Sequence, residues 1–544
     1  MNISEDKISG QIVDVIRQRI FSGSLLISDG KILDIVEEQV ESSNFIIPGF
    51  VDAHVHIESS LLIPTEFARL AVCQGTVAAV SDPHEIANVM GIDGITFMIE
   101  NGKKVPFKFF FGAPSCVPAT EFETAGAIIS ASQIDELLGN PDMYYLAEMM
   151  NYPGVLHDDK QVLAKIRSAH KHNKVVDGHA PSLRGADAKK YFDAGISTDH
   201  ECYTEEEGRE KIELGMKVII REGSAAKNFE ALIPLLSKYP DHIMFCTDDA
   251  HPNYLVHGHI NKLAARAIAA GCDIWHVLVA VSKNPIVHYG LSVGMLQKGD
   301  NADFCIVRDL KNFDCISTFV NGRKVFGNSI PMFDSIPQEP LNHFNSDVLG
   351  IEQLQIESTS NNIRVIVVED GQLVTKHEIT PAKILKGKVV SDPENDTLKL
   401  VVVNRYHNSQ PAIAFVKGFG FKHGAIASSV AHDCHNVIAV GVNDEDLIKA
   451  INKVIEHKGG LALVGEGDSH FIPLPYGGLM TNTDGFRLAE DYDVLQNKSN
   501  NLGTHLHDPF MTLSFCALLV IPSLKLSDRG LFDGDKFEFV SVNA

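Results

Sequence analysis

Two histidines lie two residues apart in an apolar run, FVDAHVH at 50–56. Side chains alternate between the two faces of a strand, so His54 and His56 point the same way. Two imidazoles at one strand end suit a divalent metal ion. Such a pair is also common in proteins without a metal, so its meaning depends on the residues that end the other strands.

Histidines and carboxylates also end several later β-rich runs. In an α/β barrel the carboxyl ends of the strands converge on one face, where the active site lies. Nitrogen and oxygen ligands without thiolates suit Mn(II), Fe(II) or Zn(II). With one bridging carboxylate, five or six ligands can hold two metals about 3.5–4 Å apart. The residues expected to meet in one pocket are His54, His56, Glu148, His179, His200 and one of Asp248 and Asp249.

The elements that must position these residues alternate along the chain. Helical stretches such as 158–171 and 184–194 separate short β-rich runs. This alternation predicts an α/β fold, a distorted (β/α)8 TIM-type barrel over 49–290. A doubly wound sheet is the alternative, although neither GxGxxG nor a P-loop supports it. The expected strands are 50–56, 75–82, 107–112, 143–149, 174–179, 195–200, 215–221 and 242–248.

Segments on both sides of the barrel predict further modules. Residues 1–48 and 291–332 contain short apolar runs with the turn dipeptides Asp29-Gly30 and Asn321-Gly322. We expect them to form one discontinuous β module of sandwich type. The polar stretch 333–362 is expected to be a linker. Residues 363–544 predict a separate α+β domain with a helix at 443–457.

Composition excludes several partners. Lys plus Arg is 47 and Asp plus Glu is 70, a net charge of −23, whereas nucleic-acid binders present a basic face. No apolar run approaches the roughly 18–20 residues that span a membrane. The start MNISEDKISG lacks the basic and apolar regions of a signal peptide. The nine cysteines include no CxxC pair, which favours free thiols in a cytoplasmic protein.

Longer blocks of sequence carry a family resemblance. PGFVDAHVHIESS at 48–60 resembles the first-strand motif of the amidohydrolase superfamily and, with IESS included, the adenine deaminase family. The last third is similar to that family at 416–441 and 509–531, so the resemblance covers nearly the whole chain. Further similar blocks are VSDPHEIANVMG (80–91), AEMMNYPGV (147–155), DGHAPSLRG (177–185), STDHECYTEEEG (197–208), IREGSAAKN (220–228) and CTDDAHP (246–252).

The resemblance implies roles for individual residues and a homodimeric assembly. Asp248 would bind metal and shuttle protons, and we favour it over Asp249 because it directly follows Thr247 at the strand end. Glu148 would take the bridging position that a carboxylated lysine occupies in many relatives. The metal-binding histidines implied by the family motifs are His54, His56, His179 and His200.

The implied reaction converts adenine and water to hypoxanthine and ammonia in purine salvage. A metal lowers the pKa of bound water from about 15.7 towards 7, and this supplies hydroxide at neutral pH. Asp248 is the candidate general base. Candidates to protonate or orient the purine ring are Glu201, His84 and Glu85. Candidates to bind the base are Ser182, Arg184 and Asp249.

Alternatives remain at this point. A related amidohydrolase could act on a cyclic amide or another aminated heterocycle, and a barrel without catalysis could serve as a scaffold. Cytidine-type deaminases are excluded, because His56-Ile57-Glu58 has no PCxxC partner motif. The C-terminal segment His432-Asp433-Cys434-His435 is either a further metal site or a polar loop packed beside the barrel mouth.

Overall fold

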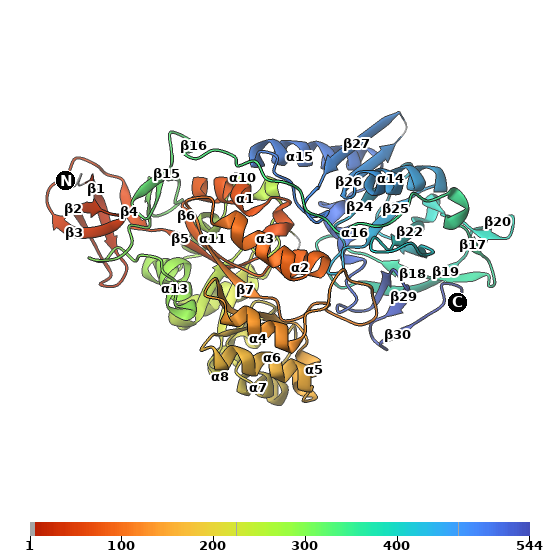
Figure 1. Cartoon of the computed structure of the whole chain (residues 1–544), viewed down its shortest axis with the longest axis horizontal. Coiled ribbons are helices and arrows are strands. Elements are labelled where there is room, and N and C mark those ends of the chain that lie inside the picture. Colours follow the sequence, from red (N-terminus) through yellow and green to blue (C-terminus); the bar gives the residue numbers. More distant parts are fainter. Residues whose placement is uncertain (1–5, 225, 466) are drawn as a thin grey trace.

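The computed structural model describes residues 6–224, 226–465 and 467–544. Residues 1–5, half of the polar start considered above, lie outside the described residues. A β module, a barrel and a C-terminal domain follow one another along the longest axis (Figure 1). In the described ranges, no helix has both the length and the apolar character needed to cross a membrane.

Eight parallel strands build the barrel, which confirms the predicted fold class. Five of them form one sheet and three form another. Isolated parallel bridges from Val176 to Ile196 and from Val55 to Asp248 join the two sheets into a ring. The strands are β5 (Phe50–Val55), β6 (Thr76–Ser81), β7 (Lys108–Ala113), β8 (Met143–Met149), β9 (Val176–Gly178), β10 (Thr198–Asp199), β11 (Lys217–Arg221) and β12 (Ile243–Cys246).

Local sequence explains why helices follow these strands. In α6 (Lys160–Lys171), Asp159 caps the first turn, and Val162, Ile166 and Ala169 form the buried stripe. The helix α8 (Glu205–Leu214) ends at Gly215, which has a positive φ of 110°. The other barrel helices include α1 (Pro64–Ala71), α2 (His84–Met90), α3 (Ile92–Gly102), α4 (Ala131–Gly139), α7 (Gly185–Asp193), α9 (Phe229–Lys238), α10 (Pro252–His257), α11 (Ile260–Ala269) and α13 (Asn284–Tyr289).

The two segments that flank the barrel form one eight-stranded mixed sheet. Its order is β16-β15-β14-β13-β4-β1-β2-β3. Strand β4 joins the segments, because it pairs with β1 in parallel and with β13 in antiparallel fashion. The strands are β1 (Asp6–Asp14), β2 (Arg19–Ser28), β3 (Lys31–Glu37), β4 (Phe45–Pro48), β13 (Phe304–Val307), β14 (Cys315–Val320), β15 (Arg323–Gly327) and β16 (Ile330–Pro331).

The C-terminal domain is built on a second eight-stranded sheet, of order β19-β18-β23-β22-β25-β24-β26-β27. The expected helix at 443–457 is α14 (Asp444–Glu456). Residues 333–350 contain no regular element, yet Phe333, Ile336 and Leu341 pack against the main core. The strands of this sheet are β18 (Asn362–Val367), β19 (Lys376–Pro381), β22 (Leu398–Val403), β23 (Ala412–Lys417), β24 (Ala425–Ser428), β25 (Val437–Gly441), β26 (Gly460–Gly465) and β27 (Asp468–Pro473). Other elements of the domain include α15 (Gly485–Asn501), α16 (Pro509–Phe515), β28 (Leu524–Ser527) and β29 (Gly530–Asp533).

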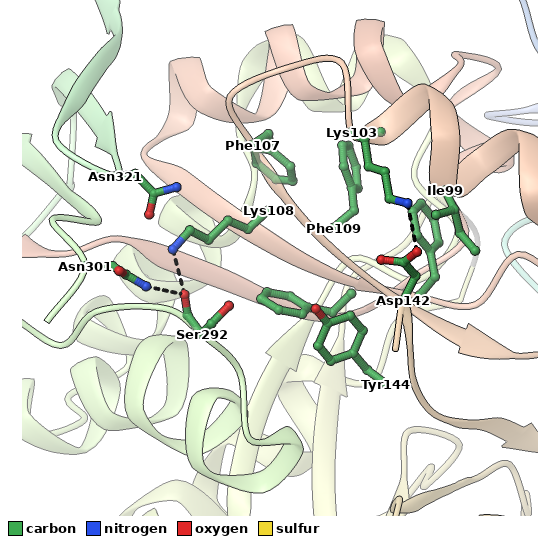
Figure 2. Close-up of a pocket in the computed structure, with 13 residues that line it drawn as sticks. Ile99, Lys103, Phe107, Lys108, Phe109, Asp142, Tyr144, Ser292, Asn301 and Asn321 are labelled. Atoms are coloured by element: carbon green, nitrogen blue, oxygen red, sulfur yellow. Dashed lines mark hydrogen bonds and ion pairs between the residues drawn. The ribbon is translucent and has the colours of Figure 1, made fainter. Parts of the chain in front are cut away.

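A cavity of about 350 Å³ lies beside the amino ends of β7 and β8, away from the strand ends that carry the predicted site (Figure 2). Its charged groups already have partners. Lys108 donates to the carbonyl of Ser292 and to Asp303, and Lys103 pairs with Asp142. The face of a barrel at the amino ends of its strands usually contributes to stability, whereas catalytic residues lie at the carboxyl ends.

A buried ion cluster near β10 generates a stability prediction. Lys211 donates to Asp199 and Glu207 at 2.9 Å each and to the carbonyl of Ala180 at 2.7 Å. The substitution Lys211→Met leaves two buried carboxylates without their cation, which costs about 3–5 kcal/mol of folding free energy. Thermal unfolding should show a clear drop in Tm. The exposed pair of Lys189 with Asp193 is the control, since Lys189→Met should change Tm little.

Candidate active site

The ring-closing bridge between β5 and β12 brings two histidines to one aspartate. The amide of Asp248 donates to the carbonyl of His54, and the amide of His56 donates to the carbonyl of Asp248. Oδ1 of Asp248 lies 3.6 Å from Nε2 of His54 and 3.3 Å from Nε2 of His56. The two Nε2 atoms are 3.2 Å apart. All three side chains are buried.

The hydrogen bonds of these histidines suit a metal ligand. Nδ1 of His56 lies 3.1 Å from the carbonyl of Asp82, so this nitrogen carries the proton and Nε2 presents a lone pair. Nδ1 of His54 is buried without a hydrogen-bond partner in the described part of the chain. Two facing nitrogen lone pairs beside a carboxylate would repel one another unless a cation lies between them. The donor set therefore fits a divalent metal.

A second group of donors lies on the other side of Glu148. Nδ1 of His179 is 2.8 Å from Oε2 of Glu148, and Nε2 of His200 is 3.1 Å from the same oxygen. The other oxygen, Oε1, lies 3.4 Å from Nε2 of His56. One carboxylate thus faces both histidine groups, one oxygen to each. This is the arrangement that a bridging ligand between two metals requires.

Charge around the pocket keeps its two central carboxylates ionised. Burial alone would raise the pKa of Glu148, but His179 and His200 outweigh burial and hold this pKa well below its usual range. Burial also opposes ionisation of Asp248, and Arg221 together with His56 lowers its pKa well below the usual value. Both groups can therefore act as anionic ligands or proton acceptors.

The two adjacent aspartates have different surroundings. Asp248 faces His54 and His56, whereas Oδ1 of Asp249 accepts a hydrogen bond of 2.5 Å from Ser59. Asp248 adopts a positive φ of 54°, an uncommon conformation for a residue other than glycine. Asp249 still lines the pocket. The geometry thus favours Asp248 as the ligand and leaves Asp249 within reach of a substrate.

Three other predicted residues line the same pocket. Nδ1 of His84 lies 3.4 Å from Oε1 of Glu148, and its Nε2 lies 3.5 Å from Oε1 of Glu85. Glu201 is held by Arg221, whose Nη2 donates to it at 2.8 Å. Both oxygens of Glu201 thus accept hydrogen bonds from Arg221, which fixes the position of this carboxylate at the pocket.

Two expected base-binding residues lie elsewhere. Ser182 and Arg184 are exposed, and neither lines the pocket. Arg184 directly precedes α7 at the surface, and its guanidinium pairs with Glu206 and Glu210. These carboxylates turn the side chain towards α8 and away from the barrel axis. The structure therefore does not bring Ser182 and Arg184 to the pocket with the other predicted residues, and a role for them in binding the base stays a prediction.

The C-terminal domain closes the pocket. It contributes an apolar wall and, through His432 and Asp433, part of the polar lining. Nζ of Lys525 on β28 is buried and donates to the carbonyls of Leu373 and Phe515, at 2.8 and 2.9 Å. Lys525 thus fastens together two segments of the wall. The wall side chains are Leu373, Phe515, Leu518, Val520 and Ile521.

Sequence reasoning assigned no role to Arg221, although its guanidinium links Glu201 to Asp248, donating to the latter at 2.7 Å. Arg221 ends β11, so the strand-end argument that found the histidines would also have found it. For the C-terminal segment, the structure places His432 and His435 against Glu85, and of the two histidines His432 lines the pocket. Their i, i+3 spacing was the only local signal.

Comparison with known proteins agrees with this geometry. Residues 45–325 match the amidohydrolase family, and residues 372–538 match the adenine deaminase C-terminal domain. The chain is therefore a member of the amidohydrolases, hydrolases whose family implies a divalent metal.

Full-length relatives narrow this class. An adenine deaminase of Methanosarcina mazei is 51% identical over 99% of this chain and 99% of its own length. Those of Sulfurovum sp. and Borreliella burgdorferi are 50% and 48% identical, each over 98% of this chain and 99% of their own lengths. The chain belongs to the adenine deaminase family, which confirms the resemblance found in its sequence.

The buried Lys525 predicts a pH-dependent stability. Burial lowers its pKa to about 8. From pH 8 to about 10.5 the unfolded chain binds more protons at this lysine than the folded chain, so raising the pH favours folding. Across this pH range the lysine raises the free energy of unfolding by about 3 kcal/mol in total. Wild type should therefore gain stability relative to Lys525→Met across this range in urea unfolding. A difference between the two proteins that stays constant with pH would contradict the prediction.

Proposed function

We propose that this protein is an adenine aminohydrolase that converts adenine and water to hypoxanthine and ammonia. The observation that carries the proposal is the pocket in which Glu148 faces two histidine groups under a wall from the C-terminal domain. The full-length relatives named adenine deaminase support the choice of substrate. In the reaction, oxygen from water bonds to C6 of adenine, and the exocyclic nitrogen leaves as ammonia.

We also propose that the site holds two divalent metals. The first would be held by His54, His56 and Asp248, the second by His179 and His200, with Glu148 between them. Mn(II) or Fe(II) fits this set of nitrogen and oxygen donors, and Zn(II) is an acceptable third. A bound metal would supply the Lewis acidity that lowers the pKa of water towards about 7.

The chain's own residues supply the proton transfers and the orientation. Asp248 takes a proton from the attacking water and delivers it to the departing amine. Arg221 holds Asp248 and Glu201 at fixed positions through hydrogen bonds to both. His84 lies between Glu148 and Glu85, where it can orient the ring edge next to C6. The apolar wall excludes water, which strengthens every one of these interactions.

The proposal also covers the cellular compartment and the oligomeric state of the enzyme. All nine cysteines are free, which agrees with a reducing cytoplasm. We propose a cytoplasmic homodimer that serves purine salvage, with adenine as its small-molecule substrate. Light scattering of the purified protein tests the dimer.

Substrate assays separate the proposal from its alternatives. Purified protein supplemented with Mn(II) should release ammonia and hypoxanthine from adenine, while adenosine and dihydroorotate remain unchanged. Turnover of dihydroorotate instead of adenine would favour an amidohydrolase for cyclic amides. A protein that lacks stoichiometric bound metal after growth in supplemented medium, and that turns over none of the three, would favour a scaffold.

Metal content and activity should fall together in ligand variants. His54→Ala and His179→Ala each remove one ligand, from different sides of Glu148, so each should lower metal per chain and reduce turnover at least about 100-fold. Elemental analysis and the ammonia assay on the same samples measure this. His407→Ala in the C-terminal domain is a control outside the pocket lining. Full metal content in both ligand variants would contradict the assignment.

The two aspartates should respond differently to loss of charge. Asp248→Asn removes the proposed general base and should lower kcat by a factor of about 10²–10⁴. Asp249→Asn keeps the hydrogen bond with Ser59 within reach and should change kcat much less. Steady-state kinetics on both variants measures the difference. The reverse ranking would exchange the two roles.

A further inference from the structure

Glu85 connects the barrel to the C-terminal domain through two histidines. It lies in the first turn of α2, while His432 and His435 lie in the loop between β24 and β25. Oε1 of Glu85 contacts Nδ1 of His432, and Oε2 contacts Nε2 of His435. All three side chains are buried. Neither the metal-ligand assignment nor the proton transfers described above use either histidine.

The backbone fixes the tautomer of His435. The amide of Ala431 donates to Nδ1 of His435 at 3.2 Å, so this nitrogen carries a lone pair. The proton of a neutral His435 is then on Nε2, where it is donated to Glu85. A neutral imidazole that bound a metal through Nε2 would instead need its proton on Nδ1. This cluster is therefore a hydrogen-bonded triad and not a further metal site.

The ring of His432 is fixed on two sides and open on a third. Its Nδ1 contacts Glu85, and its face stacks on Phe515 with ring centroids 4.8 Å apart and planes 16° apart. Its Nε2 makes no hydrogen bond in the described part of the chain. This nitrogen is also not fully buried. Because His432 lines the pocket, this nitrogen has access to the substrate cavity.

Glu85 also sets the charge of His432. Burial opposes protonation, but the adjacent carboxylate outweighs burial and raises the pKa of His432 to about 9. At neutral pH both ring nitrogens then carry protons. With Nδ1 committed to Glu85, the proton on Nε2 is available to an acceptor in the cavity.

We propose that His432 is a substrate-binding residue that donates a hydrogen bond from Nε2 to a ring nitrogen of the purine. The inference rests on the proposed function. Because C6 must face Asp248 and the histidines of the barrel, the C-terminal domain meets another part of the purine. The acceptor is therefore a ring nitrogen that is not bonded to C6: N3, which lies across the six-membered ring from C6, or N7 of the five-membered ring.

Two substitutions separate this contact from the contact with Glu85. His432→Asn keeps a donor near the position of Nδ1 but places no atom at Nε2. His432→Gln reaches the position of Nε2 and should restore part of the lost binding. A hydrogen bond from a charged donor is worth about 1.5–3 kcal/mol, a change of roughly 10–150-fold in affinity. His457→Asn, at an exposed histidine of the same domain, is the matched control.

Binding of adenine analogues tests the proposal without relying on turnover. Calorimetry with 3-deazaadenine and 7-deazaadenine, each lacking one candidate acceptor, compares wild type with His432→Asn in the metal-loaded enzyme. One analogue should bind the variant roughly 10–150-fold more weakly than wild type. The other, which lacks the acceptor, should bind both proteins equally.

Equal losses for both analogues, or no loss for either, would overturn the proposal. Wild-type activity on adenine is measured separately. Its absence would reject the proposed function, whereas normal activity together with unchanged analogue binding would reject only the role of His432.

Discussion

The site depends on one buried carboxylate, that of Glu148. Its two oxygens face different histidine groups, with Oε2 at 2.8 Å from His179 and Oε1 at 3.4 Å from His56. A buried carboxylate is unfavourable unless cations or donors surround it. The barrel satisfies this requirement by placing β8 between the strands that carry the two groups. The ring closure between Val55 and Asp248 then completes the set, because it places Asp248 beside His54 and His56.

The second constraint is that the pocket belongs to two domains. The barrel supplies the metal-ligand candidates, while the C-terminal domain supplies an apolar wall and the histidines that contact Glu85. Lys525 holds two wall segments through hydrogen bonds to the carbonyl groups of Leu373 and Phe515. A barrel without this domain would leave the strand ends open to water, where electrostatic interactions are much weaker. The domain therefore has a chemical role as well as a structural one.

Much of this arrangement follows from the sequence, for a simple reason. The strand-end rule needs only the periodicity of short apolar runs and the residues that follow them, and it brings His56, Glu148 and His200 to one pocket. The structure does not bring Arg184 to this pocket, because its guanidinium pairs with the surface carboxylates of Glu206 and Glu210. Sequence also could not join Glu85 to His432, since 347 positions and a domain boundary separate them. Contacts of that kind are set by how domains pack, which local patterns do not encode.

The central claim is that two metals lie on either side of Glu148. Anomalous diffraction from crystals of the Mn(II)-loaded protein, collected above and below the manganese absorption edge, tests it directly. The account predicts two anomalous peaks about 3.5–4 Å apart. One should be ligated by His54, His56 and Asp248 and the other by His179 and His200, with an oxygen of Glu148 on each. A fully loaded, active crystal whose only anomalous peak lies away from Glu148 would contradict it.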